Sequence, residues 1–170
     1  DFDMLWMGFW PSHAEQMRGL KAFYTTESAQ RVGEALNQVL DCSSMQHFNS
    51  IRVRNEPDQA TRQQGFGYMF NCALEENKGP QDVADVFQKW NRYLDDNGID
   101  HGVTALFPSS GATEDATGTF KFLWGGDFAN VGESLNFLTK PESNATWQKI
   151  TERTYSCDTF DRGYLFQRYN

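Results

Sequence analysis

Apolar positions recur along the chain with two different periods, and these periods predict its helices and strands. Segment 80–96 (PQDVADVFQKWNRYLDD) places apolar residues three or four positions apart, as an amphipathic helix does. Pro80 suits the first position of that helix, and Asn97-Gly98 supplies a stop signal. Segments 65–76 and 101–108 are short apolar runs that predict strands.

The beginning of the chain resembles its end, which predicts an internal repeat. Residues 2–10 (FDMLWMGFW) align with residues 120–128 (FKFLWGGDF), and further identities follow in order after one short gap. The matched pairs are Phe2/Phe120, Leu5/Leu123, Trp6/Trp124, Gly8/Gly126, Glu15/Glu133, Leu20/Leu138, Glu27/Glu142, Ser28/Ser143 and Cys42/Cys157. Matches of Trp, Gly and Cys are the ones least expected by chance.

Each copy predicts an apolar strand, a short helical stretch, a second helix and a closing strand. Ser28 and Ser143 are the expected N-caps of the second helices. The closing strands are expected at 47–54 and 162–169. The apolar faces of the second helices are expected to be Val32, Ala35, Leu36 and Val39 in one copy, and Trp147, Ile150, Thr151 and Thr154 in the other.

Together with residues 65–119, the second copy has the element order βαββαβ. That order predicts an α+β, ferredoxin-like unit, with an antiparallel sheet and helices on one face. The expected organisation is the second half of a first unit at 1–54, a polar linker at 55–64 and a complete unit at 65–170. Either the natural protein is longer and holds the rest of the first unit, or another chain completes its sheet.

Two of the three cysteines precede closing strands, and the third lies in the first strand of the complete unit. In a ferredoxin-like sheet the first and last strands are neighbours, so Cys72 and Cys157 are expected to form a disulfide. Such a bridge predicts an oxidising compartment, extracytoplasmic or secreted; three free thiols in a cytoplasmic protein are the alternative. The sequon at Asn144 is a candidate glycosylation site.

The overall charge excludes some partners. The formal net charge is −8 without any cluster of Lys or Arg, which disfavours nucleic acid. No apolar run reaches the roughly 20 residues of a membrane span. The cysteines and histidines lack metal-ligand spacing, so no metal site is predicted. Neither dinucleotide, P-loop nor haem motifs occur, and no cofactor is predicted.

Candidates for chemistry are few. His13, with Glu15 two residues on, and His101, beside Asp100, are the weak candidates for a catalytic base. Surface histidines at element ends are the favoured interpretation, and Glu15 equally suits the start of a helix. Trp6 and Trp124 could line a cavity for a small apolar ligand, although core packing against helices explains them as well.

Two ferredoxin-like units in tandem resemble the dimeric α+β barrel proteins. The FxxLWxG strand, the Ser-capped helix and the Cys before the last strand are also similar to uncharacterised proteins of marine bacteria. The resemblance implies either a small-molecule-binding protein or cofactor-free enzyme, or an assembly protein without readable chemistry. Because half a unit leaves open strand edges, we expect an interaction or assembly protein of the cell envelope or extracellular space. Its expected partner is itself or another chain that completes the first unit.

Overall fold

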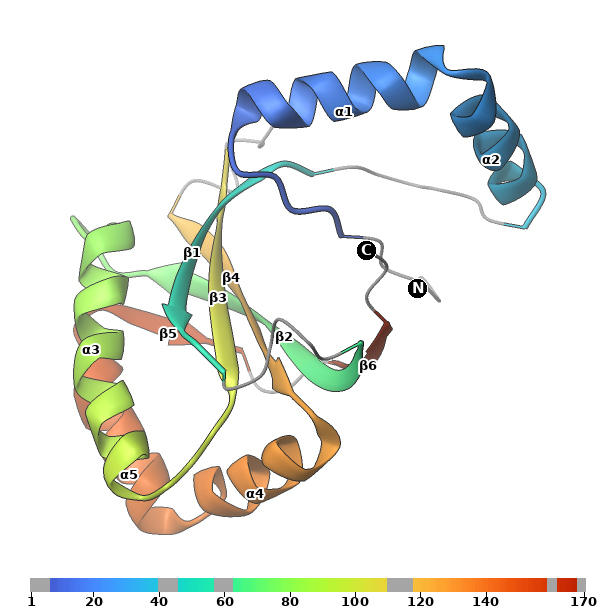
Figure 1. Cartoon of the computed structure of the whole chain (residues 1–170). Helices are drawn as coiled ribbons and strands as arrows, with labels where there is room; N and C mark the ends of the chain where they lie inside the picture. The colour runs from blue at the N-terminus through green and yellow to red at the C-terminus, as the bar shows by residue number, and fades with distance from the viewer. Residues whose placement is uncertain (1–6, 40–45, 57–62, 110–117, 159–161, 168–170) are drawn as a thin grey trace. The chain divides into compact units, whose positions relative to one another are not determined.

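The computed structural model describes residues 7–39, 46–56, 63–109, 118–158 and 162–167, in two compact units (Figure 1). The first unit spans Asp1–Met45 and the second spans Gln46–Asn170. The first holds helices α1 (His13–Thr25) and α2 (Glu27–Asn37). The second is a mixed α+β unit, whose strands form one antiparallel sheet.

The second unit contains six strands and three helices among its described residues. The strands are β1 (Phe48–Arg54), β2 (Gln64–Leu74), β3 (Gly102–Pro108), β4 (Thr119–Gly126), β5 (Tyr155–Cys157) and β6 (Arg162–Gln167). The helices are α3 (Pro80–Asp96), α4 (Phe128–Leu138) and α5 (Pro141–Thr151).

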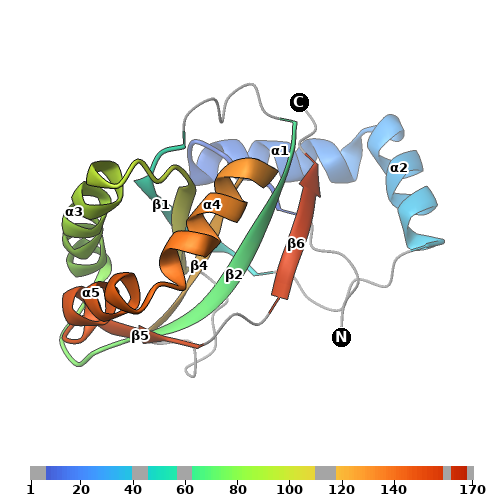
Figure 2. The same cartoon turned by 90° about the horizontal axis from the view of Figure 1, so that it is seen from below.

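The sheet has the order β1-β3-β4-β2-β5, and β6 also pairs with β2. Strands β5 and β6 lie along different stretches of the same side of β2, as Figure 2 shows. Strands β2 and β3 run parallel with β4 between them, because each is antiparallel to β4. The helix α3 therefore connects two parallel strands that are not direct neighbours.

The predicted amphipathic helix at 80–96 is confirmed as α3. Its first turn is stabilised by the Asp82 carboxylate, which accepts a hydrogen bond from the Gly79 N–H at 3.0 Å. Gly98 ends the helix region with a positive φ of 66°, a conformation that suits glycine. The predicted apolar stripe is buried, and consists of Val83, Val86, Phe87, Trp90 and Leu94.

The core lies between this stripe and alternate side chains of the strands. In β4, every second residue is buried, which orients Phe120, Phe122 and Trp124 toward the core. The ring of Phe87 packs against Phe122 at 5.0 Å and against Trp147 of α5 at 5.7 Å between centroids. Such aromatic pairs add to the stability gained from burial itself.

Two expected N-caps are wrong. Helix α2 begins at Glu27 after Thr26, and α5 begins at Pro141 after Lys140, so Ser28 and Ser143 lie inside their helices. Ser143 is buried, and its small side chain allows close packing of the helix there. Pro141 favours the first position of a helix, so α5 begins two residues before Ser143.

The first copy of the repeat differs from its prediction in two further ways. Residues 7–10 of the expected opening strand are not in a strand, and residues 1–6, with Trp6, lie outside the described residues. The apolar face expected for α2 is not buried, since no described residue of α1 or α2 is. In the second copy, by contrast, Thr151 and Thr154 are buried, and Trp147 and Ile150 pack against the core.

The predicted linker 55–64 packs against the second unit at its beginning. Glu56 is buried, and its Oε1 accepts a hydrogen bond from the Asp127 N–H at 3.0 Å. Asp127 is the N-cap of α4 and accepts from the Asn130 N–H. The chain after β1 is thereby held to the start of α4. Positions 57–62 lie outside the described residues.

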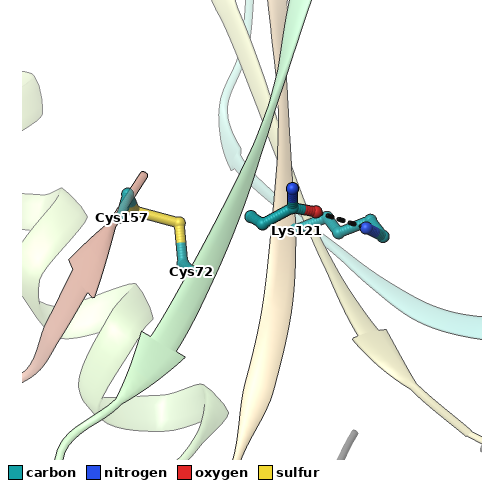
Figure 3. Close-up of a disulfide and its surroundings, with 4 residues drawn as sticks. Cys72, Lys121 and Cys157 are labelled. Carbon is teal, nitrogen blue, oxygen red and sulfur yellow. Dashed lines mark hydrogen bonds between the residues drawn. A yellow bond between two sulfur atoms is a disulfide. The ribbon is translucent and has the colours of Figure 1, made fainter. Parts of the chain in front are cut away.

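The disulfide between Cys72 and Cys157 is confirmed. The two residues are direct cross-strand partners on β2 and β5, with Cα atoms 4.0 Å apart (Figure 3). Backbone hydrogen bonds on both sides of the pair, from Asp158 to Asn71 and from Glu75 to Thr154, extend this short ladder. On the other side of β2, Lys121 donates to the Asn71 side chain. The bridge therefore holds the three-residue strand β5 on the sheet.

We predict that loss of the disulfide destabilises the second unit by about 2–5 kcal/mol, because the bridge spans a separation of 85 residues and restricts the unfolded chain. The measurement is guanidinium unfolding of the oxidised protein, the reduced protein and C72A/C157A. S156A, on the exposed part of β5, is the control and should unfold like the wild type. Equal midpoints for the oxidised and reduced proteins would contradict this account.

Candidate functional site

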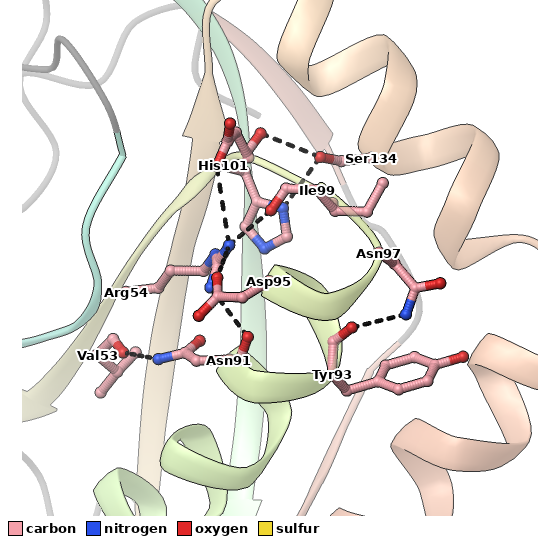
Figure 4. A network of polar contacts seen from close by, with 10 residues as sticks. Val53, Arg54, Asn91, Tyr93, Asp95, Asn97, Ile99, His101 and Ser134 are labelled. Carbon is pink, nitrogen blue, oxygen red and sulfur yellow. Dashed lines mark hydrogen bonds and ion pairs between the residues drawn. The ribbon is translucent and has the colours of Figure 1, made fainter.

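A buried arginine connects strand β1 to the end of helix α3. The Arg54 side chain is only 6% exposed, and its Nη2 donates to the Ile99 carbonyl at 2.5 Å. The same atom lies 2.9 Å from the Asp95 carboxylate and 4.0 Å from that of Asp100 (Figure 4). A buried cation needs such partners to offset its loss of hydration. The Arg54 cluster (Arg54, Asn91, Asp95, Ile99 and Asp100) therefore stabilises this edge of the sheet.

Asn91 supplies a second link between the same elements. Its Nδ2 donates to the Val53 carbonyl at 2.7 Å, while its own backbone carbonyl lies 3.5 Å from Arg54 Nη1. The Arg54 side chain of β1 thus contacts the backbone of α3, and the Asn91 side chain of α3 contacts the backbone of β1. The consequence is a polar connection between β1 and α3 that flanks the apolar stripe of the helix.

A pocket of about 450 Å³ lies beside the Arg54 cluster. Its walls come from the end of β1, the two residues that follow, the last turns of α3 and the approach to β3. The lining residues are Arg52, Val53, Arg54, Asn55, Glu56, Asn91, Asp95 and Asp100. The lining is polar and carries both signs of charge, unlike the mostly apolar walls typical of pockets for drug-sized ligands.

Two buried polar atoms in this lining have no hydrogen-bond partner. They are the Nε of Arg54, which can donate, and the Oδ1 of Asn91, which can accept. Both atoms are out of contact with solvent, so their unmet hydrogen bonds lie inside the cluster and not on the open wall of the pocket. The lining contains no Ser, Thr, Cys, His or Lys side chain that could act as an activated nucleophile.

His101 lies in the core and not at the surface, where it was expected. The ring is 1% exposed, and its Nδ1 lies 3.0 Å from the Ser134 hydroxyl of α4. That hydroxyl donates to the Asp100 carbonyl at 3.3 Å, and the His101 ring packs on Trp124 at 5.2 Å between centroids. The surface prediction failed because the residue opens a strand whose next six residues are all buried.

The environment of His101 keeps the ring neutral. Burial, and to a smaller extent the Arg54 guanidinium, lowers the pKa of His101 to about 3. A base this weak and this inaccessible does not suit proton transfer near neutral pH. The structure thus gives His101 a packing role between β3 and α4.

The other predicted site residues are dispersed. His13 opens α1 at the surface; the Glu15 N–H donates to the N-cap Ser12, and the Glu15 carboxylate pairs with Arg18. Trp124 is a core residue against Tyr68 and His101 and does not line the pocket. Asn144 is exposed on α5. The candidate residues for catalysis or ligand binding that the structure describes all lie outside the pocket.

An exposed apolar surface lies on the first unit. We call it the helix surface, and it consists of the exposed large apolar residues Phe9, Trp10, Met17, Tyr24, Val32 and Val39. Val32 is 51% exposed and Val39 is 77% exposed, although both belong to the predicted apolar face, and Val39 lies beyond the end of α2 at Asn37. Within the first unit, the Trp10 indole packs over Gly19 of α1, and the Phe23 ring of α1 lies next to Gly33 of α2. Of this surface, Val32 and Val39 belong to the apolar face that the sequence predicts for the second helix.

Comparisons with known proteins add no identity. No family model, curated protein or solved structure shows significant similarity to this chain. Among the described helices, none is long and apolar enough to cross a bilayer. Within the same residues, no group of three or more His, Cys, Asp and Glu side chains could hold a metal ion.

We predict an acid-dependent loss of stability that originates at His101. In the unfolded chain the histidine binds a proton below its ordinary pKa of 6.5, whereas the folded chain binds none until about pH 3. The His101 contribution is therefore full above pH 6.5 and declines between pH 6.5 and 3, at up to about 1.4 kcal/mol per pH unit.

Urea unfolding of the wild type and H101N at several pH values between 8 and 4 measures this slope. Asparagine retains a polar group near the position of Nδ1 but does not titrate. The difference in unfolding free energy between the two proteins should shrink as the pH falls. A constant difference over this range would show that His101 titrates alike in both states.

Proposed function

We propose that this protein acts as an assembly protein, which associates through the helix surface of its first unit. The observation that carries the proposal is the exposure of the first unit: no described residue of α1 or α2 is buried, and six large apolar side chains in and next to these helices are exposed. Exposed apolar clusters of this kind are typical of protein–protein contacts. Isolated helices of this length are also marginal in water, so a partner is needed to stabilise them.

The energy available from such a contact is sufficient for stable association. Burial of one large aliphatic or aromatic side chain contributes about 1.5–3 kcal/mol, so a few of these residues offset the entropy cost of association. Val32 and Leu36 lie one turn apart on α2, and Val39 follows soon after the helix ends at Asn37. This end of the first unit therefore offers neighbouring apolar side chains to a partner.

A second copy of the same chain is the partner that the charges favour. The described part of the first unit carries three basic residues (Arg18, Lys21, Arg31) and three acidic residues (Glu15, Glu27, Glu34). Asp1, Asp3 and Asp41 add to these, so the first unit as a whole carries −3 of the chain's formal net charge of −8. Two copies can bring the neutral described part of this unit together without strong repulsion, in the twofold arrangement most common among homo-oligomers.

The strand order also supports a duplicated ferredoxin-like arrangement for this chain. Strands β2, β3, β4 and β5 follow the chain order and the sheet order of a ferredoxin-like unit. In the proposed duplication, α1, α2 and β1 correspond to α4, α5 and β6. The apolar residues of α4 and α5 pack on the core of their own unit, whereas those of α1 and α2 stay exposed for the partner copy.

The disulfide supports an extracytoplasmic compartment. A bridge between Cys72 and Cys157 persists where the surroundings are oxidising, as in the cell envelope or outside the cell. The proposed role is thus assembly in an extracytoplasmic space.

We predict that V32D abolishes self-association. A carboxylate in the centre of the apolar stripe would be buried without a partner in the assembled form, but it costs little in the separate chain because Val32 is half exposed. Sedimentation velocity of the wild type at increasing concentrations should show a dimer, and V32D should stay monomeric.

N37D is the matched control, since it adds the same charge to the opposite face of α2. It should associate like the wild type. A wild-type chain that stays monomeric over the whole accessible concentration range, with α1 and α2 amides protected from hydrogen exchange, would refute the proposal.

A further inference from the structure

Helix α5 carries an N-glycosylation sequon, which consists of Asn144, Ala145 and Thr146. No other Asn-X-Ser/Thr triplet occurs in the sequence. Such a triplet also arises by chance, so its place in the fold decides whether it can carry a sugar. An N-linked glycan is bulky and strongly hydrated, and it requires an asparagine at the surface.

Asn144 lies where the folded unit can hold such a group. It is exposed, and so are Lys140, Pro141 and Gln148, which lie about one helical turn from it. A sugar on the Asn144 side chain would therefore extend into solvent between these residues, without displacing packed side chains.

The core-facing side of α5 is formed by other residues. Ser143 and Thr151 are buried, and the Trp147 ring packs against Trp90 of α3 at 4.9 Å between centroids. Helix α5 lies beside α3 in both views of the fold (Figures 1 and 2). The apolar packing that holds α5 to the core therefore does not use Asn144.

The folded helix, however, keeps the sequon in a form that a transferase cannot use. The Asn144 N–H donates to the Lys140 carbonyl at 3.0 Å, and Thr146 Oγ1 donates to the Glu142 carbonyl at 2.8 Å. An oligosaccharyltransferase recognises the asparagine together with the hydroxyl two positions on. Residues two positions apart point to different sides of a helix, so one active site cannot contact both while α5 is folded.

We propose that Asn144 is an N-glycosylation site, and that its sugar is attached before α5 folds. The donor is an oligosaccharide linked to a polyprenyl diphosphate. The Asn144 Nδ2 attacks the anomeric carbon of the first sugar, so that a C–N bond forms and the C–O bond to the diphosphate breaks. The polyprenyl diphosphate leaves with the bonding electron pair, and the amide nitrogen loses one proton to a base of the transferase.

This inference rests on the extracytoplasmic compartment in the proposed function, because the transferases that read this sequon act on chains that enter such a space. It does not use the helix surface. The order of events follows from the geometry of α5, since the exposed position accommodates the finished glycan and the helical hydrogen bonds oppose its attachment.

The test offers the full chain to a purified oligosaccharyltransferase, with a polyprenyl-diphosphate-linked oligosaccharide as the donor. One sample is the oxidised, folded protein, and the other is the reduced chain, diluted from denaturant when the reaction starts. Intact mass and peptide mapping should show one oligosaccharide at Asn144 of the unfolded chain. The folded protein should react at least roughly tenfold more slowly, because α5 must first open locally.

Two variants of the sequon separate recognition from folding. T146V keeps the shape of the threonine without its hydroxyl, so neither form of this variant should be modified. A145G keeps the sequon but weakens the helix, so the folded variant should react about fivefold faster than the folded wild type. Each folded rate is divided by the rate of the same chain when unfolded, which removes any change in the sequon itself.

Q88G is the matched control, since it introduces the same weakening at an exposed position of α3 and should react like the wild type. Absence of transfer to the unfolded wild type, or transfer that T146V retains, would overturn the site. Equal rates for the folded and unfolded wild type would overturn the order of events. V32D should accept the sugar as the wild type does while losing self-association, so the proposed assembly and this site can fail separately.

Discussion

The long strand β2 is the constraint on which the second unit depends. It pairs with β4 over most of its length on one side, and with both β5 and β6 on the other. Where Gly67 faces Gly125, a Cβ on Gly67 would lie 2.8 Å from the Trp124 carbonyl oxygen, and one on Gly125 would lie 2.6 Å from that of Phe66. Only glycine allows this approach, so the pair holds the two strands in a single register.

Once this register is set, the positions of the helices follow. The alternation along β4 directs Phe120, Phe122 and Trp124 into the core, where the stripe of α3 meets them. Residues that flank this stripe contact β1 through the Arg54 cluster. Helix α3 is therefore held by apolar packing along its length and, near its end, by an ion pair between the buried Arg54 and the exposed Asp95.

Much of the second unit could be predicted from its sequence, because its signals are local. The stripe of α3, the apolar runs of β2 and β3, and the positions of Cys72 and Cys157 depend on period and spacing within short segments. The bounds of α3 and the disulfide were predicted correctly for this reason.

The polar interior could not be predicted in the same way. Arg54, Glu56 and His101 look like surface residues in the sequence, and their burial depends on partners more than 30 positions away, such as Ile99, Asp127 and Ser134. The first unit shows the opposite failure. Its apolar stripe on α2 was recognised, but periodicity does not say whether the surface that covers a stripe belongs to the same chain.

The wide spacing of the bridged cysteines has a consequence for biosynthesis. Cys72 emerges from the ribosome long before Cys157, since 85 positions separate them, and synthesis proceeds from the N-terminus. During that interval Cys42, which has also been made by then, is a possible intramolecular partner. Correct oxidation therefore depends either on delayed bridge formation or on later thiol–disulfide exchange, in which Cys157 displaces the earlier partner.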